Sequence, residues 1–323
     1  MTPPVRIGIM GCADIARRRM LPAMAAADDI EVVAVASRTG PTAEDLAGVY
    51  SCRPVAGYDG LLALSEVDAV YIPLPLALHA RWVEAALNAG KHVLVEKPLT
   101  ADPRETCRLL DLASSRGLAL MENVMFLHHH RHDAVRRLLE RGAIGDLRSF
   151  HADFTVPRLP DQDIRYQPEL GGGALWDVGL YPVRAAMYFL GDDLEVAGAV
   201  LGASPGRQVD TSGAVLLRRG GVTAQLTFGL EHAYASRYQL RGSSGCIRVD
   251  RAFAPPADHI PVIRLDCGAD SREISLAPDD QARNSLRAFT AAVRTRKADD
   301  AAVHGSIRQA HLLALVSEGG SWK

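Results

Sequence analysis

The sequence predicts two domains, a doubly wound α/β domain with a parallel sheet and an α+β domain with a large, mostly antiparallel sheet. Three observations support this fold class. The chain has 323 residues, more than one compact domain usually holds. Its first third alternates short apolar runs with helical patterns, which is typical of parallel strands covered on both faces. The rest contains runs of period two separated by turn signals, which are typical of antiparallel hairpins.

Apolar runs without alternating polarity mark the strands of the first domain, which we predict to span residues 1–122. Two of the helices between them end at Gly90 and Gly117, a common stop for a helix. The expected strands are Val5–Met10, Ile30–Ala36, Ala69–Ile72, His92–Val95 and Leu118–Met121. The expected helices run from the first glycine turn to about Ala27, then over Ala43–Val49, Tyr58–Leu64, His79–Ala89 and Pro103–Arg116.

The second domain, predicted to span residues 123–323, has a different rhythm. Its expected strands alternate polar and apolar residues, and they are Ser149–Val156, Ala214–Leu217, Gly221–Phe228, Arg237–Arg241 and Cys246–Val249. Helical patterns cover Arg131–Arg141, Ala174–Leu190, Gln281–Arg294 and Gly305–Ser317. The alternation predicts an apolar sheet face that pairs between subunits, and therefore a homodimer or homotetramer.

Composition excludes several classes of function. With a net charge of −2, 48% apolar and 23% charged residues, the chain has no footprint for nucleic acid or a membrane surface. No apolar run approaches the ~18 residues that span a bilayer, and no signal peptide is recognisable at the start. The five cysteines are scattered, so we expect free thiols in a reducing cytoplasm.

A glycine turn, Gly11-Cys12-Ala13-Asp14-Ile15-Ala16, directly follows the first expected strand. It fits the pattern G-x-G-x-x-G/A only with Ala13 in the second glycine place, where a β-carbon would crowd a pyrophosphate. The strand before it and the helix after it strengthen the match. The helix N-terminus then offers unpaired N–H groups and the positive end of its dipole to phosphate. We therefore predict a dinucleotide site here, over the alternative of a purely structural turn.

The end of the second expected strand indicates which dinucleotide binds. NAD sites usually place an acid there for the ribose 2′-hydroxyl, but this chain has Ser37-Arg38-Thr39 and no acid before Glu44. A guanidinium can bind a 2′-phosphate through two hydrogen bonds and stack on adenine, and a serine hydroxyl can join it. The alternative is a solvated arginine at a strand end. Ser37 and Arg38 therefore favour NADP(H) over NAD.

The tripeptide Glu96-Lys97-Pro98 ends another expected strand in the stretch "KHVLVEKPLT". Ligands bind outside the carboxyl ends of parallel strands. Only four of the 36 lysines and arginines are lysines, and lysine can lose its proton when partly buried. This choice hints at proton chemistry at Lys97, whereas Lys91 and Lys297 are expected at the surface. Taken alone, the tripeptide favours a surface Glu-Lys pair before a turn.

Several segments, in order and across essentially the whole chain, resemble the Gfo/Idh/MocA oxidoreductases. They are "IGIMGCADIA", "VASR", "DAVYIPLPLALH", "AALNAGKHVLVEKPL", "LMENVMFLHH", "IRYQPELGGGALWDVGLYPVRAA" and "GSIRQAHLLALV". Within the family, "GCADIA", "MENVMFLHH", "DIRYQ", "GGGALWDVGLYP" and "VTAQLTFGLEHAY" are most similar to NADP-dependent sugar 3-ketoreductases of antibiotic deoxysugar pathways. The resemblance implies a Rossmann-type first domain and NADPH-dependent reduction of a 3-keto group on a dTDP-linked deoxysugar.

The resemblance also implies roles for individual residues. It places the Glu-Lys-Pro tripeptide over the nicotinamide, with a cis Lys–Pro bond, and gives Lys97 a hydrogen bond to the substrate carbonyl. Tyr181 would deliver the proton; the alternative, a buried tyrosine that packs on the other domain, is the less favoured one even without the family. Asp177 lies four residues before Tyr181, on the same helix face. The predicted cofactor contacts are Gly11, Cys12, Ala13, Asp14, Ile15, Ser37, Arg38, Tyr58, Leu74, Pro75, His79, Glu96, Lys97, Arg165 and Asp177.

The run His128-His129-His130-Arg131-His132-Asp133 invites a metal interpretation, because two pairs in it have i,i+4 spacing. A zinc site usually needs three or four ligands, and no third ligand is evident at sensible spacing. Clustered histidines at a helix start are often merely solvated. We therefore predict no metal site.

Three other functions fit parts of the sequence. A dehydrogenase of a free sugar, inositol or other polyol would be favoured by an acid after the second strand, which is missing. A catalytically silent nucleotide-sensing regulator could dispense with Lys97 and Tyr181, and a structural scaffold would not explain the glycine turn. The residues therefore favour an enzyme with a small-molecule nucleotide-sugar substrate and no nucleic-acid or membrane partner.

Overall fold

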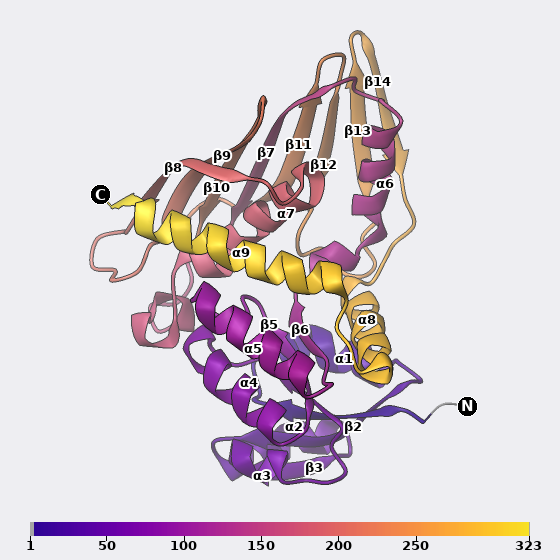
Figure 1. Ribbon diagram of the computed structural model, residues 1–323, viewed down its shortest axis with the longest axis vertical. Coiled ribbons are helices and arrows are strands. Elements are labelled where there is room, and N and C mark those ends of the chain that lie inside the picture. Colours follow the sequence, from indigo (N-terminus) through magenta and orange to yellow (C-terminus); the bar gives the residue numbers. More distant parts are fainter. Residues whose placement is uncertain (1–2, 323) are drawn as a thin grey trace. The chain divides into compact units, whose positions relative to one another are not determined.

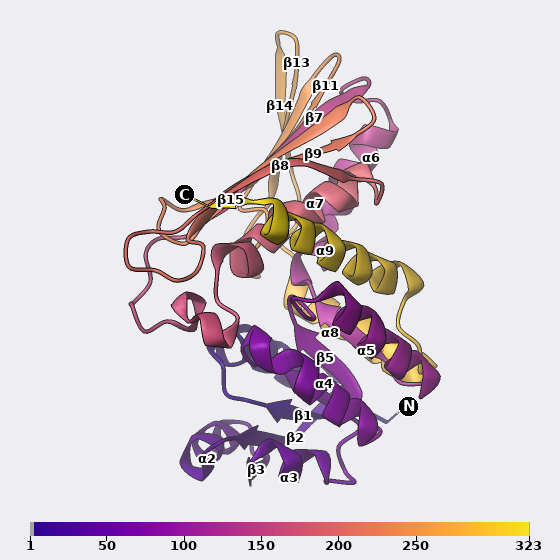
Figure 2. The same ribbon diagram turned by 60° about the vertical axis from the view of Figure 1, so that its left-hand side comes forward.

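The computed structural model describes residues 3–322, which fold into two compact units (Figure 1 and Figure 2). The first unit comprises the chain up to Met125 together with Ala282–Ile307. The second comprises Phe126–Gln281 and the chain from Arg308 onward. The domain boundary expected after residue 122 lies close to the end of the first segment at Met125. The sequence analysis did not predict that residues 282–307 return to the first unit.

Six parallel strands in the order β3-β2-β1-β4-β5-β6 form the sheet of the first unit. They are β1 (Val5–Met10), β2 (Ile30–Ser37), β3 (Arg53–Ala56), β4 (Ala69–Ile72), β5 (His92–Glu96) and β6 (Leu120–Asn123). The wholly buried β4 and β5 read as continuous apolar runs for that reason. The sequence analysis did not predict β3, because it is a short edge strand that is mostly exposed and contains Pro54.

Helices cover both faces of this sheet. One apolar core packs against α1 (Leu21–Ala25), α2 (Gly40–Val49) and α8 (Gln281–Thr295). The core on the opposite face packs against α3 (Tyr58–Leu62), α4 (His79–Asn88) and α5 (Pro103–Ser115). Leu286 and Phe289 of α8 are almost fully buried in the first core, which explains why this helix belongs to the first unit.

Nine strands form the sheet of the second unit, in the order β14-β13-β12-β11-β7-β10-β9-β8-β15. Only the β7–β10 and β8–β15 pairs are parallel, so the predicted mostly antiparallel sheet is confirmed. The strands are β7 (Leu147–Thr155), β8 (Glu195–Gly202), β9 (Ser212–Arg219), β10 (Val222–Gly229), β11 (Ala235–Gly242), β12 (Cys246–Asp250), β13 (Val262–Cys267), β14 (Asp270–Ser275) and β15 (Ser321–Trp322). The sequence did not predict β8, whose bulge between Val196 and Gly198 breaks the alternation, nor β13, β14 and β15.

Three longer helices accompany this sheet. They are α6 (His130–Glu140), α7 (Leu180–Leu190) and α9 (Asp300–Gly319), which begins in the first unit and ends in the second. Phe189 of α7 packs against Phe150 of β7 and Tyr238 of β11, so α7 covers one face of the sheet. Among the residues that the structure describes, no helix is long and apolar enough to cross a membrane.

Candidate active site

The glycine turn after β1 has the backbone that close approach of a phosphate requires. Gly11 has a φ of +116°, which favours glycine, and its N–H donates to the Ala36 carbonyl at 2.9 Å. A β-carbon on Gly11 would lie 2.8 Å from Leu74 Cδ2, so a side chain there would displace Leu74 in addition to straining the backbone. Residues 12–15 are partly or fully exposed, and an ion pair joins Asp14 to Arg18. The turn therefore fits a bound pyrophosphate.

Ser37, Arg38 and Tyr58 gather near this turn, at the end of β2. Ser37 is the buried last residue of β2, and Arg38 is exposed. The Tyr58 hydroxyl lies 3.8 Å from the place of a β-carbon on Gly11, and its ring packs edge-on against Trp82. Burial raises the pKa of Tyr58. The Arg38 guanidinium is near enough to oppose this rise by its charge. Their contact with a cofactor stays a prediction.

Glu96, the buried last residue of β5, is fixed by two side chains that sequence reasoning missed. Its Oε1 accepts a hydrogen bond from the Tyr71 hydroxyl at 2.6 Å and from Asn123 Nδ2 at 2.7 Å. Asn123 is itself held by Ser285 Oγ of α8, which donates to its Oδ1 at 2.7 Å. These partners come from β4, β6 and α8, so only the folded sheet reveals them. Glu96 is therefore a fixed internal acid and not half of a solvated surface pair.

Lys97 follows β5, is partly buried, and precedes Pro98 through a cis peptide bond, as the resemblance implies. His79 is only 1% exposed and lies between the loop after β4, which contains Leu74, and the loop after β5, which contains Pro98. Its Nδ1 is 2.8 Å from the Pro98 carbonyl, and its Nε2 is 2.8 Å from the Leu74 carbonyl. Burial lowers the pKa of His79, and a neutral imidazole can donate to only one of the two carbonyls at a time. His79 thus ties the Leu74–Pro75 loop to the segment that carries Lys97.

Lys91 corrects the sequence-based expectation for a neighbouring residue. It was expected at the surface, but it is only 8% exposed. Its Nζ donates to the carbonyls of Leu64 and Val67, each at 2.7 Å. The long aliphatic stem of lysine allows this burial while its charged end satisfies two carbonyls.

In the second unit, Arg165 and Asp177 come together as an ion pair. Arg165 Nε donates to Asp177 Oδ2 at 2.6 Å, and its Nη1 lies 3.1 Å from Asp163 Oδ1. The Asp177 carboxylate raises the pKa of Arg165 and keeps it charged. The pair is partly exposed, with side-chain accessibilities of 39% for Arg165 and 24% for Asp177. Two residues predicted to contact the cofactor are therefore neighbours, and Arg165 is already neutralised within its own unit.

Tyr181, the second residue of α7, packs among aromatic rings. Its ring centroid lies 4.8 Å from that of Phe154, 5.7 Å from that of Phe253 and 5.8 Å from that of Phe126. The side chain is partly exposed. This packing limits where the phenol can move, which suits a positioned proton donor. Lys97 belongs to the first unit and Tyr181 to the second, so their pairing stays a prediction.

The helix that carries Asp177 and Tyr181 begins with a π-helical turn over Leu175–Gly179. The sequence predicted an ordinary helix from Ala174. Pro182 accounts for the wider turn, because a proline ring clashes with the carbonyl four residues earlier and has no N–H to donate. The same order recurs in the first unit, where Pro22 follows a π-helical turn over Ala16–Met20.

Asp210, which sequence reasoning missed, holds the start of this helix. Its Oδ2 accepts a hydrogen bond from Leu175 N at 2.7 Å, and its carbonyl accepts one from Ala174 N at 2.8 Å. Gly173 has a φ of +127°, and a β-carbon there would collide with Asp210 Oδ1. Asp210 is only 5% exposed, and this burial raises its pKa to about 6. It lies 33 residues beyond Asp177, so no local pattern reveals the contact.

The raised pKa of Asp210 predicts that the unmodified protein gains stability relative to Asp210→Asn as the pH falls from 7 to 4. Between 3.8 and about 6, the folded state binds a proton that the unfolded state releases, so stability falls as the pH rises through this window. The shift corresponds to roughly 3 kcal/mol at most. Urea denaturation of both proteins at several pH values measures the difference, and a difference independent of pH contradicts the prediction.

The histidine run is buried in part, so the expectation that these histidines are solvated is wrong for His129 and His132, which are 1% and 0% exposed. Asp279 supplies the third side chain that the sequence did not show, with Oδ2 2.8 Å from His130 Nδ1 and 3.5 Å from His129 Nδ1. Donor atoms of these three residues lie within 4.8 Å of one another, close enough to share a metal ion. The neighbouring Arg131 opposes a second cation: burial lowers its pKa only to about 10, so it stays charged at neutral pH.

We expect exhaustive chelation to leave the activity and the thermal midpoint unchanged. Two of the atoms that could bind a metal already accept hydrogen bonds. His129 Nδ1 accepts one from Arg131 N at 3.2 Å, and Asp279 Oδ2 accepts one from His130 N at 2.9 Å. Differential scanning calorimetry and an activity assay before and after chelation provide the measurement. A loss that added zinc restores would establish a metal site at His129, His130 and Asp279.

The fold and these residues together define an NAD(P)-dependent oxidoreductase, with a glycine turn at the point where the order of the parallel strands reverses. Residues 5–124 match the family model of the oxidoreductase family with an NAD-binding Rossmann fold. Residues 132–248 match the model of the GFO/IDH/MocA C-terminal domain. The chain belongs to the Gfo/Idh/MocA family of oxidoreductases.

Several relatives match almost the whole chain. The chain is 50% identical to dTDP-3,4-didehydro-2,6-dideoxy-alpha-D-glucose 3-reductase of Actinomadura kijaniata, covering 98% of this chain and 96% of the relative. A reductase of the same name from Streptomyces violaceoruber is also 50% identical, covering 97% of this chain and 95% of the relative. The solved structure of a 3-ketoreductase from Actinomadura kijaniata in complex with NADP and TDP-benzene is similar with a TM-score of 0.97 and 49% identity, covering 99% of this chain and 98% of that one.

Proposed function

We propose that the protein reduces the 3-keto group of a dTDP-linked deoxysugar with NADPH. The observation that carries this proposal is the 50% identity, over nearly the full length of both chains, to reductases named for that reaction. Relatives that are 35% and 29% identical to this chain are named for other substrates. The 50% identity over nearly the full length therefore supports the substrate class of the sugar-nucleotide reductases.

The chain's own residues divide the work. NADPH, when bound, supplies the hydride. The backbone of residues 11–15 holds the pyrophosphate at the helix N-terminus, and Ser37 and Arg38 bind the 2′-phosphate. Lys97 hydrogen-bonds the carbonyl oxygen and stabilises the charge that develops there, while Tyr181 delivers a proton to it. The remaining proposed contacts are Tyr58, Leu74, Pro75, His79, Glu96, Arg165 and Asp177.

The choice of a lysine and a tyrosine has support from a relative. The 3-ketoreductase from Actinomadura kijaniata has been solved as variants in which a tyrosine is replaced by phenylalanine and a lysine by alanine or glutamate. These are the same two residue types that we assign to the carbonyl oxygen.

Oxidation of a free sugar or polyol is the second candidate. The chain is 35% identical to D-xylose 1-dehydrogenase (NADP(+)) 2 of Haloferax volcanii, covering 89% of each chain. It is 29% identical to the NADP-dependent scyllo-inositol 2-dehydrogenase of Bacillus subtilis, covering 78% of this chain. Both names specify NADP, so Ser37 and Arg38 do not separate the two candidates. The higher identity and coverage of the sugar-nucleotide reductases favour the first.

Two measurements test the proposed function. Native mass spectrometry of the purified protein should detect a co-purifying thymidine nucleotide, whereas a free polyol would favour the second candidate. The protein should also oxidise NADPH in the presence of a dTDP-linked 3-keto deoxysugar and leave NADP⁺ unreduced with D-xylose or inositol. The opposite pattern of activity would replace the first candidate by the second.

We also propose a cytoplasmic homodimer or homotetramer that pairs through the C-terminal sheet. The five free thiols suit a reducing compartment. The outer sheet face is less apolar than predicted, since it carries ion pairs such as Arg237–Asp153, but exposed apolar residues gather on β8 and β9. Val200 and Leu216 there are 48% and 40% exposed.

Leu216→Glu should therefore shift the oligomer towards monomer in analytical ultracentrifugation. Burying an unpaired carboxylate in an interface is strongly unfavourable. The control is Leu315→Glu, the same change at a leucine of α9 that is 50% exposed and lies outside the sheet. Identical sedimentation of Leu216→Glu and the unmodified protein contradicts pairing through this patch.

A further inference from the structure

The segment 203–211, which joins β8 to β9, is anchored on its own sheet. Thr211 N donates to the Gly202 carbonyl at 2.8 Å, and Ser204 N donates to Thr211 Oγ1 at 2.9 Å. Leu230 N, just after β10, donates to the Thr211 carbonyl at 2.8 Å. Thr211 is only 3% exposed. The sheet therefore gives this segment a fixed base.

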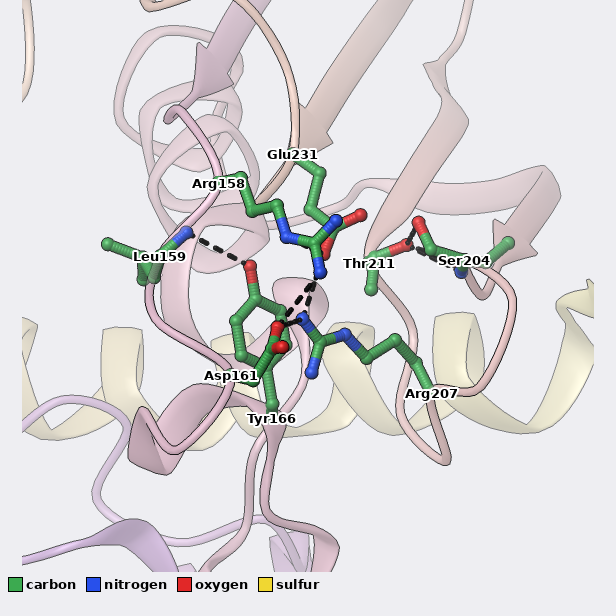
Figure 3. A network of polar contacts seen from close by, with 9 residues as sticks. Arg158, Leu159, Asp161, Tyr166, Ser204, Arg207, Thr211 and Glu231 are labelled. Atoms are coloured by element: carbon green, nitrogen blue, oxygen red, sulfur yellow. Dashed lines mark hydrogen bonds and ion pairs between the residues drawn. The ribbon is translucent and has the colours of Figure 1, made fainter.

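Arg207 of this segment holds the turn that carries Arg165. Its guanidinium carbon lies 3.7 Å from the ring centroid of Tyr166, the residue after Arg165 (Figure 3). The Nη2 atom lies 2.6 Å from Asp161 Oδ1 and 3.3 Å from Glu231 Oε1. The side chains of Arg207 and Glu231 are only 12% and 15% exposed, so their contact is largely shielded from water, whereas Asp161 is 60% exposed. A planar guanidinium can stack on an aromatic ring and bind carboxylates at its edge at the same time.

Asp210, three residues further along, holds a second element of the proposed site. It binds the N–H groups of Ala174 and Leu175, where the helix that carries Asp177 and Tyr181 begins. The collision that a β-carbon on Gly173 would make with Asp210 Oδ1 shows how closely the chain fits around this carboxylate. One short segment thus contacts both elements that carry the proposed site residues of the second unit.

We propose that Arg207 and Asp210 are positioning residues for the reaction, Arg207 through the turn that carries Arg165 and Asp210 through the helix that carries Asp177 and Tyr181. This inference rests on the proposed function, because it takes those three residues as the site. The 2.6 Å bond between Arg165 and Asp177 joins the two elements, so a shift in either one displaces the other. A misplacement of about 1 Å can lower a rate by about 100-fold.

Arg207→Ala should lower kcat for the dTDP-linked keto sugar by about tenfold or more, and it should weaken NADPH binding less than Arg38→Ala does, because it displaces the proposed cofactor contact Arg165 without removing it. Arg207→Lys should recover only part of the loss, since an ammonium keeps the charge but not the planar stacking. The matched control is Arg158→Ala. Arg158 contacts the same two acids, at 2.9 Å from Asp161 and 4.0 Å from Glu231, but its side chain is 65% exposed. It should keep near-normal kcat.

Asp210→Ala and Asp210→Asn test the second contact. Asparagine keeps an oxygen that can accept from Leu175 N, whereas alanine leaves this N–H without its side-chain acceptor. We expect Asp210→Asn to keep most of kcat and Asp210→Ala to lose about tenfold or more. Equal kcat in the unmodified protein, Arg207→Ala and Asp210→Ala would overturn the inference.

Hydrogen exchange distinguishes a failure of this inference from a failure of the proposed function. Arg207→Ala should speed amide exchange in residues 164–170, and Asp210→Ala should speed it in 174–178, while the first unit keeps its exchange pattern. Arg158→Ala should change neither segment. If the unmodified protein fails to reduce the keto sugar, the proposed function fails, but this exchange pattern still supports the positioning role. Unchanged exchange in both segments contradicts that role whatever the substrate.

Discussion

Lys97→Ala is expected to lower kcat with a dTDP-linked 3-keto deoxysugar by about 10³- to 10⁴-fold, because it removes both a hydrogen bond and a charge from the carbonyl oxygen. A lysine ammonium stabilises the alkoxide that develops on the carbonyl oxygen by its charge as well as by its hydrogen bond. The structure supports a fixed place for Lys97, because Glu96 before it is held by Tyr71 and Asn123, and the Pro98 carbonyl after it contacts His79.

Tyr181→Phe should cost less, about 10²- to 10³-fold, because a phenol offers only a hydrogen bond and a proton. Phenylalanine keeps the packing against Phe154, so this variant should fold normally. NADPH affinity should survive in both variants, since neither residue holds the phosphates. Lys297→Ala is the matched control, because Lys297 is exposed and ion-paired to Asp300. Near-normal kcat in Lys97→Ala refutes the mechanism, and greater damage in Tyr181→Phe reverses the two assignments.

Arg38→Ala should remove most of the preference for NADPH over NADH, the second large effect. Hydrogen bonds from a guanidinium to a phosphate group contribute about 1.5–3 kcal/mol, so NADPH affinity should fall about 10- to 100-fold. NADH affinity should change little, because it has no 2′-phosphate. Titration calorimetry with both cofactors measures each affinity without any sugar substrate.

Arg53→Ala is the control for this experiment. Arg53 is also an exposed arginine of the first unit, but it is ion-paired to Glu66 at 3.1 Å. It should leave both affinities unchanged. Equal affinity of the unmodified protein for NADPH and NADH would contradict the NADP assignment.

The first unit could be predicted from the sequence because its signals are local. The buried strands β1, β2, β4 and β5 read as apolar runs, and glycines follow helices such as α4. The position of α8 could not be predicted, because Leu286 and Phe289 could pack in any apolar core. Only the structure shows that they pack in the core of the first unit. Edge strands such as β14 carry too little apolar alternation to be recognised.

The candidate site divides in the same way. Gly11, Lys97 and Tyr181 lie in motifs that the sequence shows. Tyr71 and Asn123 hold Glu96, and Arg207 and Asp210 contact the elements that carry Arg165 and Tyr181. All four lie far along the chain from the residues that they contact, and an isolated polar residue gives no signal of what it will touch. The histidine run is a further example. Its motif is visible in the sequence, but Asp279, the side chain that joins it, lies far along the chain and is found only in the structure.

Transfer of deuterium tests the central claim most directly. The protein is incubated with a dTDP-linked 3-keto deoxysugar and NADPH that carries deuterium in both positions on the reactive nicotinamide carbon, and the product is examined by mass spectrometry and NMR. We expect one deuterium per product molecule, bound to carbon 3 of the sugar, with one NADPH consumed for each. Folded protein that binds NADPH but leaves carbon 3 unlabelled and the cofactor unoxidised would contradict the proposed reduction.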